Sequence, residues 1–414
     1  MLIQFNFKNY KSFRDEATLD MTAINDIQDF SERVVSIADE KLLTVTAIYG
    51  ANASGKSNVY SAFKYMTNYV KESFGYGDDE DFSREQLPVT FLFDRVSANA
   101  ESSFEVYFII NERSVAKSYN YGFCVNREGI TEEWLNVKTS DADKYNRVFY
   151  RHTADDTLDL SGLSNDRREI IQLSLEKEAL IVSLGAKLKI QECKEVRDWF
   201  AENRFADFAN IEENSYLFSR LPYNFGEDKA VQQRVVDYLA TFDNHIKDFK
   251  TKRLPVNAND GRRSYKINSV HKMIDSSDTT VIPLQEESAG TLKMFALYPD
   301  LQEVLKNGSV FFVDELNARL HPLLVRNFLL TFLDPKINTN HAQLIFTTHD
   351  TWQMKKEFLR KDEIWFTEKD DKGLSTLYSL ADFTDLGDGD FESDYLFGEF
   401  GAIPTLSSIM KEEE

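Results

Sequence analysis

Hydrophobic and polar positions alternate at the start of the chain, and this pattern then changes period several times. Residues 2–8 alternate apolar and polar side chains and residues 16–22 do so more weakly, which predicts an opening β-hairpin. A β-branched run at 42–50 ends at a glycine and predicts a strand. Apolar residues at helical spacing follow over 57–74. The chain therefore opens with strands and continues into a strand–loop–helix unit.

Short apolar segments after this first helix predict further strands. Together with the opening hairpin they indicate an antiparallel sheet beside the strand–loop–helix unit. The segments are 89–94, 103–110, 118–125 and 148–153.

Residues 165–245 have a different pattern, because apolar side chains now recur at i, i+3 and i+4. We interpret this range as a helical insertion. It lacks sustained heptads, so a long coiled-coil arm is not expected.

The last part of the chain returns to mixed α/β patterning. Two predicted strands flank a polar turn, and strands and helices then alternate before a final hairpin. The predicted strands are 247–255, 264–273, 309–315, 343–349, 363–369 and 375–380, and the predicted helices are 289–306 and 321–333. The resulting division is an N-terminal part, 1–164, a helical insertion, 165–245, and a C-terminal part, 246–414.

Charge and composition narrow the classes of partner. The 414 residues carry 48 Lys and Arg against 69 Asp and Glu, a net charge of −21, which argues against a protein coated by nucleic acid or anionic lipid. One basic concentration stands out, and it is either a solvated hairpin or a local contact for nucleic acid or a partner. Its members are Lys247, Lys250, Lys252, Arg253, Arg262, Arg263 and Lys266.

The sequence shows none of the features that mark exported or membrane-spanning proteins, and this bears on the expected compartment. Its apolar runs stay well short of the roughly 18 residues that a membrane span needs, and the start has no cleavage-like site. The two cysteines, Cys124 and Cys193, have no pair spacing and suit a reducing environment. We expect a cytoplasmic protein without a membrane partner.

The segment GANASGKS, residues 50–57, matches G-x-x-x-x-G-K-[ST] between a predicted strand and a predicted helix. Glycines let backbone N–H groups surround a phosphate chain, and the helix N-terminus favours the same anion. Lys56 is expected to reach the β- and γ-phosphate oxygens of ATP, and the Ser57 hydroxyl is expected to bind Mg²⁺. The predicted nucleotide-binding residues here are Gly50, Asn52, Ala53, Ser54, Gly55, Lys56, Ser57 and Asn58.

Hydrolysis also requires a carboxylate for the metal and a group that activates water. The apolar strand SVFFVDE ends in Asp314 and Glu315, at the edge where ligand sites form in parallel sheets. We predict that Asp314 holds Mg²⁺ through a water molecule and that Glu315 is the general base for the attacking water. A later strand ends at His349, which suits hydrogen bonding to a γ-phosphate.

A second anion-binding helix start lies in EESAGTLKMF, where Ser288, Gly290 and Thr291 precede a helix with core spacing. One arrangement uses it: a head-to-tail pair of chains in which each helix start meets the γ-phosphate held by the other chain. The alternative is an ordinary serine-capped helix.

The ordered set NYKSF, GANASGKS, ESAGT, FFVDELNARLHP, FTTHD and GAIP resembles the ABC-type ATPase heads of the structural-maintenance-of-chromosomes and RecF-like class. It resembles more narrowly the bacterial AAA-family ATPases of the RloA and AbiL kind, which are similar to the AriA subunit of the PARIS phage-defence system. The resemblance implies an α/β P-loop head with a mixed sheet core and an antiparallel β subdomain. It also implies ATP-dependent dimerisation, slow ATP hydrolysis with Mg²⁺, and control of a separately encoded effector such as a nuclease or toxin.

The resemblance also suggests roles for individual residues. Lys56 and Ser57 match the phosphate loop, Asp314 and Glu315 match the Walker B pair, and His349 matches the switch histidine. Ser288 and Gly290 match contacts made across the dimer, and residues 317–319 match the D-loop. Asn9 and Ser12 fall where such heads approach the nucleotide. The glutamine that contacts Mg²⁺ in ABC heads has no fixed counterpart, although Gln86 is available.

Three functions follow as hypotheses. The first is an ATPase that senses infection or regulates an effector in antiphage defence, including abortive infection. The second is a RecF-like DNA repair or recombination ATPase, for which the basic concentration at 247–266 is the DNA contact. The third is a nucleotide-binding scaffold without useful hydrolysis.

Overall fold

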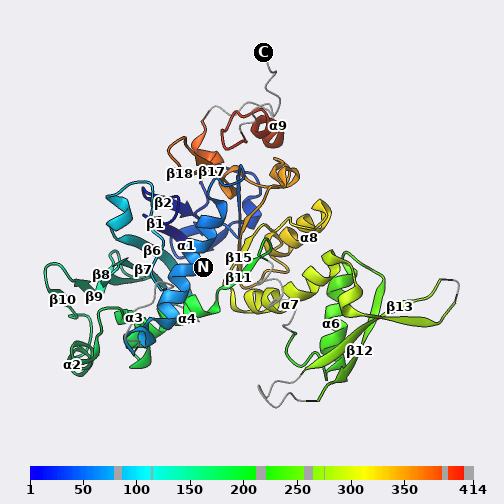
Figure 1. Ribbon diagram of the computed structural model, residues 1–414, viewed down its shortest axis with the longest axis horizontal. Coiled ribbons are helices and arrows are strands. Elements are labelled where there is room, and N and C mark those ends of the chain that lie inside the picture. The colour runs from blue at the N-terminus through cyan, green and yellow to red at the C-terminus, as the bar shows by residue number, and fades with distance from the viewer. Residues whose placement is uncertain are drawn as a thin grey trace.

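The computed structural model describes residues 1–78, 86–112, 115–210, 221–255, 264–274, 276–384 and 390–404. Within these ranges the strands form sheets of seven, six, three and two strands. The two large sheets lie side by side, and the three-stranded sheet projects from the side of the molecule that faces away from the seven-stranded sheet (Figure 1). Of the described helices, not one combines the length and the apolarity needed to cross a membrane.

The seven-stranded sheet has the order β10-β9-β8-β7-β6-β1-β2, and all its pairings are antiparallel. It confirms the predicted opening hairpin and the predicted antiparallel sheet, to which the structure adds β8 and β10. The strands are β1 (Leu2–Lys8), β2 (Ala17–Asp20), β6 (Ser102–Glu112), β7 (Val115–Asn126), β8 (Gly129–Thr139), β9 (Asn146–His152) and β10 (Thr157–Asp159).

The strand predicted over 89–94 is wrong. This segment is a loop, in which Phe91 is buried while Phe93 is 77% exposed. Its backbone is held by the first loop of the chain, because the N–H of Phe91 donates to Asn9 Oδ1 at 3.1 Å and Val89 O accepts from the Lys11 N–H. Tertiary contacts therefore decide the conformation that the apolar pattern misassigned.

The six-stranded sheet has the order β11-β15-β16-β5-β17-β18, with parallel pairing throughout except for the last strand. The predicted final hairpin is confirmed as β17–β18. The strands are β11 (Arg204–Asp207), β15 (Val310–Asp314), β16 (Gln343–Thr347), β5 (Val45–Gly50), β17 (Ile364–Lys369) and β18 (Ser375–Ser379).

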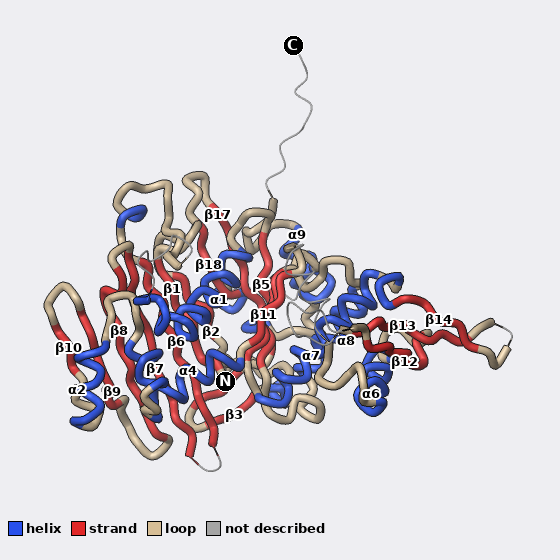
Figure 2. The backbone as a smooth tube through the Cα atoms, turned by 60° about the horizontal axis from the view of Figure 1, so that its bottom comes forward, coloured by secondary structure: helices blue, strands red, loops and turns tan. Residues whose placement is uncertain are grey.

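Both faces of β5, β15 and β16 are buried, which explains why these three central strands are nearly continuous apolar runs. On β15 the residues alternate between two cores: Phe312 packs into the core that contains the seven-stranded sheet, whereas Phe311 and Val313 pack into the other. Helix α1 (Lys56–Glu72) lies on the first side, and α7 (Ala289–Asn307) and α8 (Pro322–Leu333) lie on the second (Figure 2).

The range predicted as a helical insertion contains α2 (Asn165–Ser174), α3 (Ile181–Lys187), α4 (Gln191–Glu202) and α6 (Lys229–Ala240). It also contains β11, which pairs in parallel with β15 and so belongs to the central sheet. Cys193 and Phe200 of α4 are buried in the first core. The boundaries at 164/165 and 245/246 stay a prediction.

Helix α6 packs on a three-stranded antiparallel sheet made of β12 (Ile246–Arg253), β13 (Tyr265–Lys272) and β14 (Thr279–Pro283). The predicted pair of strands is confirmed, and β14 is an addition. Lys252 lies opposite Lys266, and both are exposed. Arg262 and Arg263 lie outside the described residues.

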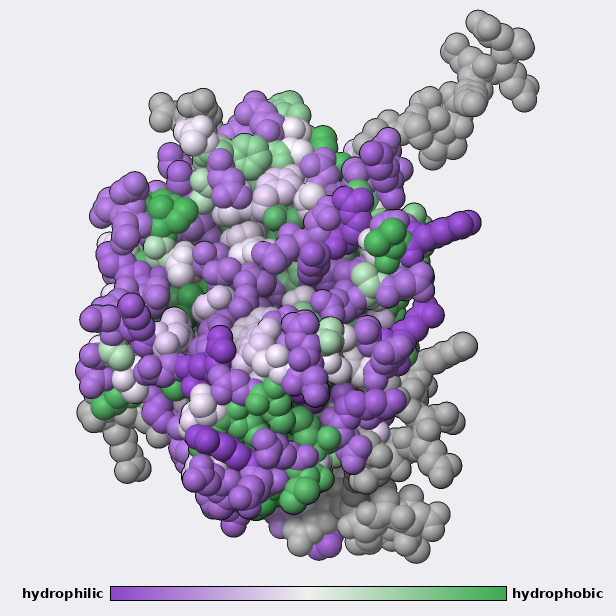
Figure 3. All heavy atoms as spheres, turned by 90° about the vertical axis from the view of Figure 1, so that its left-hand side faces the viewer, coloured by the Kyte–Doolittle hydropathy of each residue, from purple (hydrophilic) through white to green (hydrophobic). Residues whose placement is uncertain are grey.

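The remaining described elements are peripheral. A two-stranded sheet is formed by β3 (Val35–Ile37) and β4 (Glu40–Leu42), and α9 (Phe391–Leu396) lies near the carboxyl end. Seen from the side of the seven-stranded sheet, the surface is largely hydrophilic, and hydrophobic side chains gather towards its lower part, where α2 lies (Figure 3).

Candidate functional site

The carboxyl ends of β5, β15 and β16 meet at one edge of the central sheet. Strand β16 lies between the other two, and its last residue, Thr347, pairs with Ile48 of β5. Gly50, Asp314 and Thr347 are consequently the last residues of three parallel strands at one edge. Open parallel sheets bind ligands at this edge.

The phosphate loop joins β5 to α1, as predicted. The Lys56 ammonium donates to the carbonyl oxygens of Gly50 and Ala51, both at 2.9 Å, so the side chain lies over its own loop. Burial lowers the pKa of Lys56 to about 8, and the carboxylates of Asp314 and Glu315 act in the opposite direction. Gly55 gives α1 no side-chain cap, which leaves the first N–H groups of the helix available to an anion.

Two glycines are required by the loop geometry. Gly50 has φ 150° and Gly55 has φ 123°, backbone conformations that side-chain-bearing residues rarely adopt. A Cβ at Gly50 would lie 2.6 Å from Ser54 Oγ, and one at Gly55 would lie 2.8 Å from Ser375 Oγ. These close contacts are with side chains of the same chain, and the predicted role of the glycines, which is to let backbone N–H groups surround a phosphate chain, stays a prediction.

Hydroxyl groups from distant segments brace the loop. Ser375 Oγ donates to Ser54 O at 2.6 Å and lies 2.7 Å from Ser12 Oγ, and Asn58 Nδ2 donates to the same Ser12 oxygen at 2.6 Å. The Ser54 hydroxyl also lies 2.6 Å from Thr367 Oγ1. Ser12 was expected near the nucleotide, whereas Ser375 and Thr367 were missed, because hydroxyls in a predicted hairpin carry no signal of a distant partner.

Asp314 ends β15 in a buried position, with 1% of its surface exposed. Its Oδ1 accepts a hydrogen bond of 2.5 Å from Thr347 Oγ1, and the Ser57 side chain also hydrogen-bonds the carboxyl. Burial raises the pKa of Asp314, and these hydroxyls lower it. A carboxylate and a hydroxyl converging in this way are hard oxygen ligands that fit Mg²⁺. Thr347 was missed by the sequence reasoning.

Glu315 follows directly and is half-buried, with a left-handed backbone at φ 52°. Its N–H donates to Thr347 Oγ1 at 2.8 Å, so one hydroxyl contacts both residues of the acidic pair. A non-glycine residue in this conformation is uncommon and is found where surrounding contacts impose it.

The segment after Glu315 is tied to the end of β16. Asn317 Oδ1 accepts from Thr348 Oγ1 at 3.0 Å and from the His349 N–H at 3.2 Å. The His349 side chain lines a cavity of about 800 Å³ together with residues 50–54 of the phosphate loop. Burial and the nearby Lys56 lower the pKa of His349, which favours the neutral ring.

Ser288, Gly290 and Thr291 form the start of α7. Ser288 caps the helix by accepting from the Thr291 N–H at 3.1 Å, and Thr291 Oγ1 donates to Asp243 Oδ2 at 3.0 Å. Ser288 is exposed. Within one chain, none of the described contacts joins this helix start to the phosphate loop, so the structure keeps the two predicted anion sites separate.

Two weaker candidates serve local structure. The Asn9 side-chain amide donates to the carbonyls of Ser97 and Glu101 at 2.8 and 3.0 Å, and so it holds the backbone of residues 97–101 in place. Gln86 accepts a hydrogen bond on its backbone oxygen from the Tyr65 hydroxyl.

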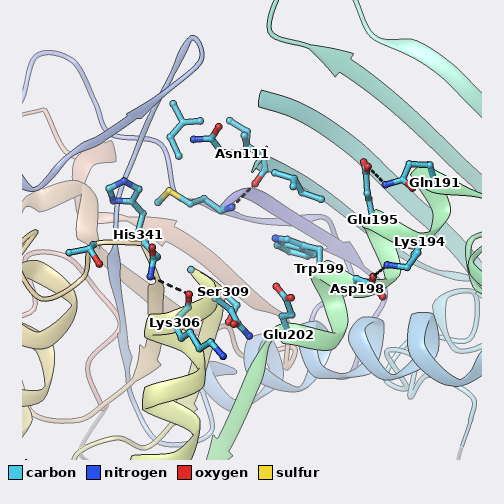
Figure 4. Close-up of a pocket in the computed structure, with 18 residues that line it drawn as sticks. Asn111, Gln191, Lys194, Glu195, Asp198, Trp199, Glu202, Lys306, Ser309 and His341 are labelled. Atoms are coloured by element: carbon cyan, nitrogen blue, oxygen red, sulfur yellow. Dashed lines mark hydrogen bonds and ion pairs between the residues drawn. The ribbon is translucent and has the colours of Figure 1, made fainter. Parts of the chain in front are cut away.

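A second cavity, of about 540 Å³, lies where β15 and β16 begin, at the other end of the sheet (Figure 4). Glu195, Asp198 and Glu202 of α4 point towards it, with Trp199 among them and His341 facing them. Lys117 and Lys194 pair with Glu195 and Asp198, at 2.8 and 2.5 Å, so these carboxylates are already engaged. This end of a parallel sheet is also not the usual ligand edge. The phosphate-loop edge is therefore the stronger nucleotide site.

Comparison with known proteins gives a family match and, separately, a structural likeness of low identity. Residues 45–351 match the family model described as "AAA domain, putative AbiEii toxin, Type IV TA system". Among solved structures, the chain is similar to an SmcHead bound to the C-winged helix domain of ScpA, at 14% identity and a TM-score of 0.40, covering 91% of this chain and 97% of that one. No curated protein matches. The fold is that of a P-loop ATPase head with a mixed α/β core.

Proposed function

The chain belongs to this AAA domain family, and from that premise we propose that it binds ATP with Mg²⁺ and hydrolyses the nucleotide at sites shared by two copies of itself. One observation carries the proposal: Lys56, Ser57, Asp314 and Glu315 converge at the carboxyl edge of one parallel sheet. These four residues supply the phosphate, metal and water functions that ATP hydrolysis needs.

The roles follow from the contacts of each side chain. Lys56 and the first N–H groups of α1 hold the phosphates, and Asp314 with Ser57 holds Mg²⁺, which neutralises charge on the phosphate oxygens when bound. Glu315 accepts a proton from the attacking water. His349, neutral at pH 7 and beside residues 50–54, donates its ring N–H to an oxygen of the γ-phosphate.

A second copy of the chain completes the site. The start of α7 is exposed at Ser288 and half-buried at Gly290, where an added Cβ would make only ordinary contact with its nearest atom, 3.7 Å away. Because this anion-binding helix start has no described contact with its own phosphate loop, a head-to-tail pair is the arrangement that brings it to a nucleotide. ATP then stabilises the pair, and loss of the γ-phosphate releases it.

The test measures phosphate release and assembly mass for three proteins: wild type, Glu315→Gln and Lys56→Ala. We expect wild-type turnover, a loss of at least about 100-fold in Glu315→Gln with an ATP-loaded dimer retained, and no ATP binding in Lys56→Ala. Turnover by Glu315→Gln at the wild-type rate would exclude Glu315 as the base.

We further propose that this ATP-dependent pairing regulates a separately encoded effector in antiphage defence. The family description, which names a putative toxin of a toxin–antitoxin system, supports a defence role. The test is a purification from infected and uninfected cells of the native host, comparing wild type with Glu315→Gln. A partner whose association depends on ATP supports the proposal, and an association indifferent to both ATP and Glu315→Gln opposes it.

A second candidate function, a DNA repair or recombination ATPase, is favoured by the β12–β13 sheet. Lys250, Lys252 and Lys266 share one face, because Lys252 and Lys266 are directly opposite and Lys250 is two residues away. The other face packs on α6, where Gln232 donates to Thr251 Oγ1. Like charges opposite each other are unfavourable unless an anion compensates them.

Duplex DNA separates the two candidates. The DNA hypothesis predicts that duplex DNA stimulates turnover, that rising salt removes the stimulation, and that a Lys250→Glu/Lys252→Glu/Lys266→Glu variant loses it. Turnover unaffected by DNA favours the effector-regulating ATPase.

A further inference from the structure

Lys293 is a buried lysine on α7 for which the proposed reaction has no role so far. It lies five residues after Ser288, and only 4% of its surface is exposed. Among the described residues no ion pair neutralises its ammonium group. Burial of such a group disfavours its charged form and lowers the pKa of Lys293 to about 7.

The contacts of Lys293 explain how the ammonium group is accommodated. It donates to the carbonyl oxygen of Ala318 and lies 3.4 Å from that of Leu316. It also lies over the Phe208 ring, 3.4 Å from the ring centroid, which is a cation–π arrangement. One side chain of α7 thus joins the turn after Glu315 to the segment after β11.

The turn that Lys293 contacts begins at Glu315. The Ala318 N–H donates to the Glu315 carbonyl at 2.9 Å, and the turn contains left-handed residues at both Glu315 and Arg319. Lys293 holds it from α7, and the end of β16 holds it through Asn317. A shift of either support changes where the Glu315 carboxylate lies.

The other end of this connection is the exposed start of α7. Glu287, directly before Ser288, accepts hydrogen bonds from Ser269 and from His271, the latter at 2.7 Å, and Thr291 is held by Asp243. Helix α7 is 19 residues long and lies between the six-stranded sheet and helix α6 (Figure 1). Because a helix is a rigid element, a displacement of its start also moves Lys293, which lies about one and a half turns further along the helix.

We infer that Lys293 is a positioning residue that couples engagement of the α7 start by the partner's nucleotide to placement of Glu315 in the same chain. The coupling makes hydrolysis at one site depend on occupancy of the other. This inference rests on the proposed function, since it needs ATP turnover by a head-to-tail pair.

The test compares the full chain as wild type, Lys293→Met, Lys293→Arg and Lys306→Met, measuring kcat, KM and binding of a fluorescent ATP analogue. Met keeps the length of the side chain without its donors, Arg keeps the donors, and Lys306 is an exposed lysine on the same helix. We expect Lys293→Met to lose about tenfold in kcat with nucleotide affinity unchanged, because a misplaced base costs rate rather than binding. Lys293→Arg should recover most of that loss, and Lys306→Met should match wild type.

Three outcomes overturn the inference: wild-type kcat in Lys293→Met, equal losses in the Met and Arg variants, or a loss that appears in KM alone. A wild-type chain without turnover refutes the proposed function itself, and this is seen before any variant is compared.

A double-mutant cycle with Gly290→Ala adds a readout that simple packing would not affect. Coupling predicts that Gly290→Ala lowers kcat in wild type and has little further effect in Lys293→Met. Additive losses contradict the coupling.

Discussion

The hydroxyl of Thr347 donates a hydrogen bond of 2.5 Å to Asp314 Oδ1. Thr347 Oγ1 also accepts the Glu315 N–H at 2.8 Å, so the last residue of β16 contacts both members of the acidic pair at the end of β15. Strand β16, which lies between β5 and β15, therefore positions the acidic residues at the end of β15, although β16 carries neither the phosphate loop nor these residues.

Replacing Thr347 with Val should lower both turnover and stability. The change keeps the shape of the side chain but leaves a buried carboxyl and the Glu315 N–H without their partner, at a cost of about 1–3 kcal/mol in unfolding free energy. We expect kcat to fall about tenfold or more, because Asp314 and Glu315 lose their relative placement. Urea unfolding and phosphate release measure the two effects, and Thr347→Ser, which keeps the hydroxyl, is the control.

Replacing Ser375 with Ala should weaken nucleotide binding more than it slows hydrolysis. Ser375 Oγ braces the phosphate loop through Ser54 O and Ser12 Oγ, at 2.6 and 2.7 Å. Its loss removes two buried hydrogen bonds, worth about 1 kcal/mol each, and we expect ATP affinity to fall several-fold. Thr376→Ala changes the exposed neighbour on the same strand and should bind ATP like wild type. Equal affinities in the two variants would contradict the bracing role.

Substitutions at Gly290 should separate folding from pairing. A Cβ there meets its nearest neighbour, Arg319 O, at 3.7 Å, which is ordinary contact. The unfolding free energy of Gly290→Ala should therefore lie within about 1 kcal/mol of the wild-type value. Gly290→Arg places a long side chain at the exposed helix start and should abolish ATP-dependent pairing while leaving ATP binding to the single chain intact. Sedimentation with and without ATP measures pairing, and a fully paired Gly290→Arg protein would remove the α7 start from the interface.

Stability should fall with rising pH through one buried carboxyl, that of Glu363. Burial, reinforced by Asp362, raises the pKa of Glu363 from 4.5 to about 8, although the Arg360 N–H and the charges of Arg33 and Arg360 act against the shift. Below pH 4.5 the group is protonated in both states and its contribution is complete. Between pH 4.5 and 8 only the unfolded chain releases the proton, so unfolding free energy declines by up to about 1.4 kcal/mol per pH unit.

Glu363→Gln isolates this contribution, because the amide oxygen can still accept the 2.9 Å hydrogen bond from the Arg360 N–H. The difference in unfolding free energy between wild type and variant should shift in favour of the variant as pH rises from 5.5 to 7.5. Urea titrations at several pH values measure it, and a constant difference would show that Glu363 is ionised in the folded protein.

The sequence by itself determined the chemistry-bearing segments, because each is local. A phosphate loop needs only a strand, glycines, a lysine and a helix in succession, and residues 45–72 supply all of these. The acidic pair at the end of β15 and the histidine just after β16 likewise come at the end of apolar runs, and such runs mark strands buried on both faces.

Only the tertiary structure decided which segments support these residues. Thr347, Ser375 and Thr367 act through hydroxyls whose partners lie 33, 321 and 313 residues away. The sequence around a serine or threonine does not reveal such a partner. Tertiary structure also decided that the four residues of β11 form a strand, because β15 offers them a free edge. It likewise decided that residues 89–94 form a loop, because Asn9 and Lys11 hydrogen-bond to the backbone of this segment. Periodicity reports what a segment can bury, whereas its neighbours in the fold determine where it does so.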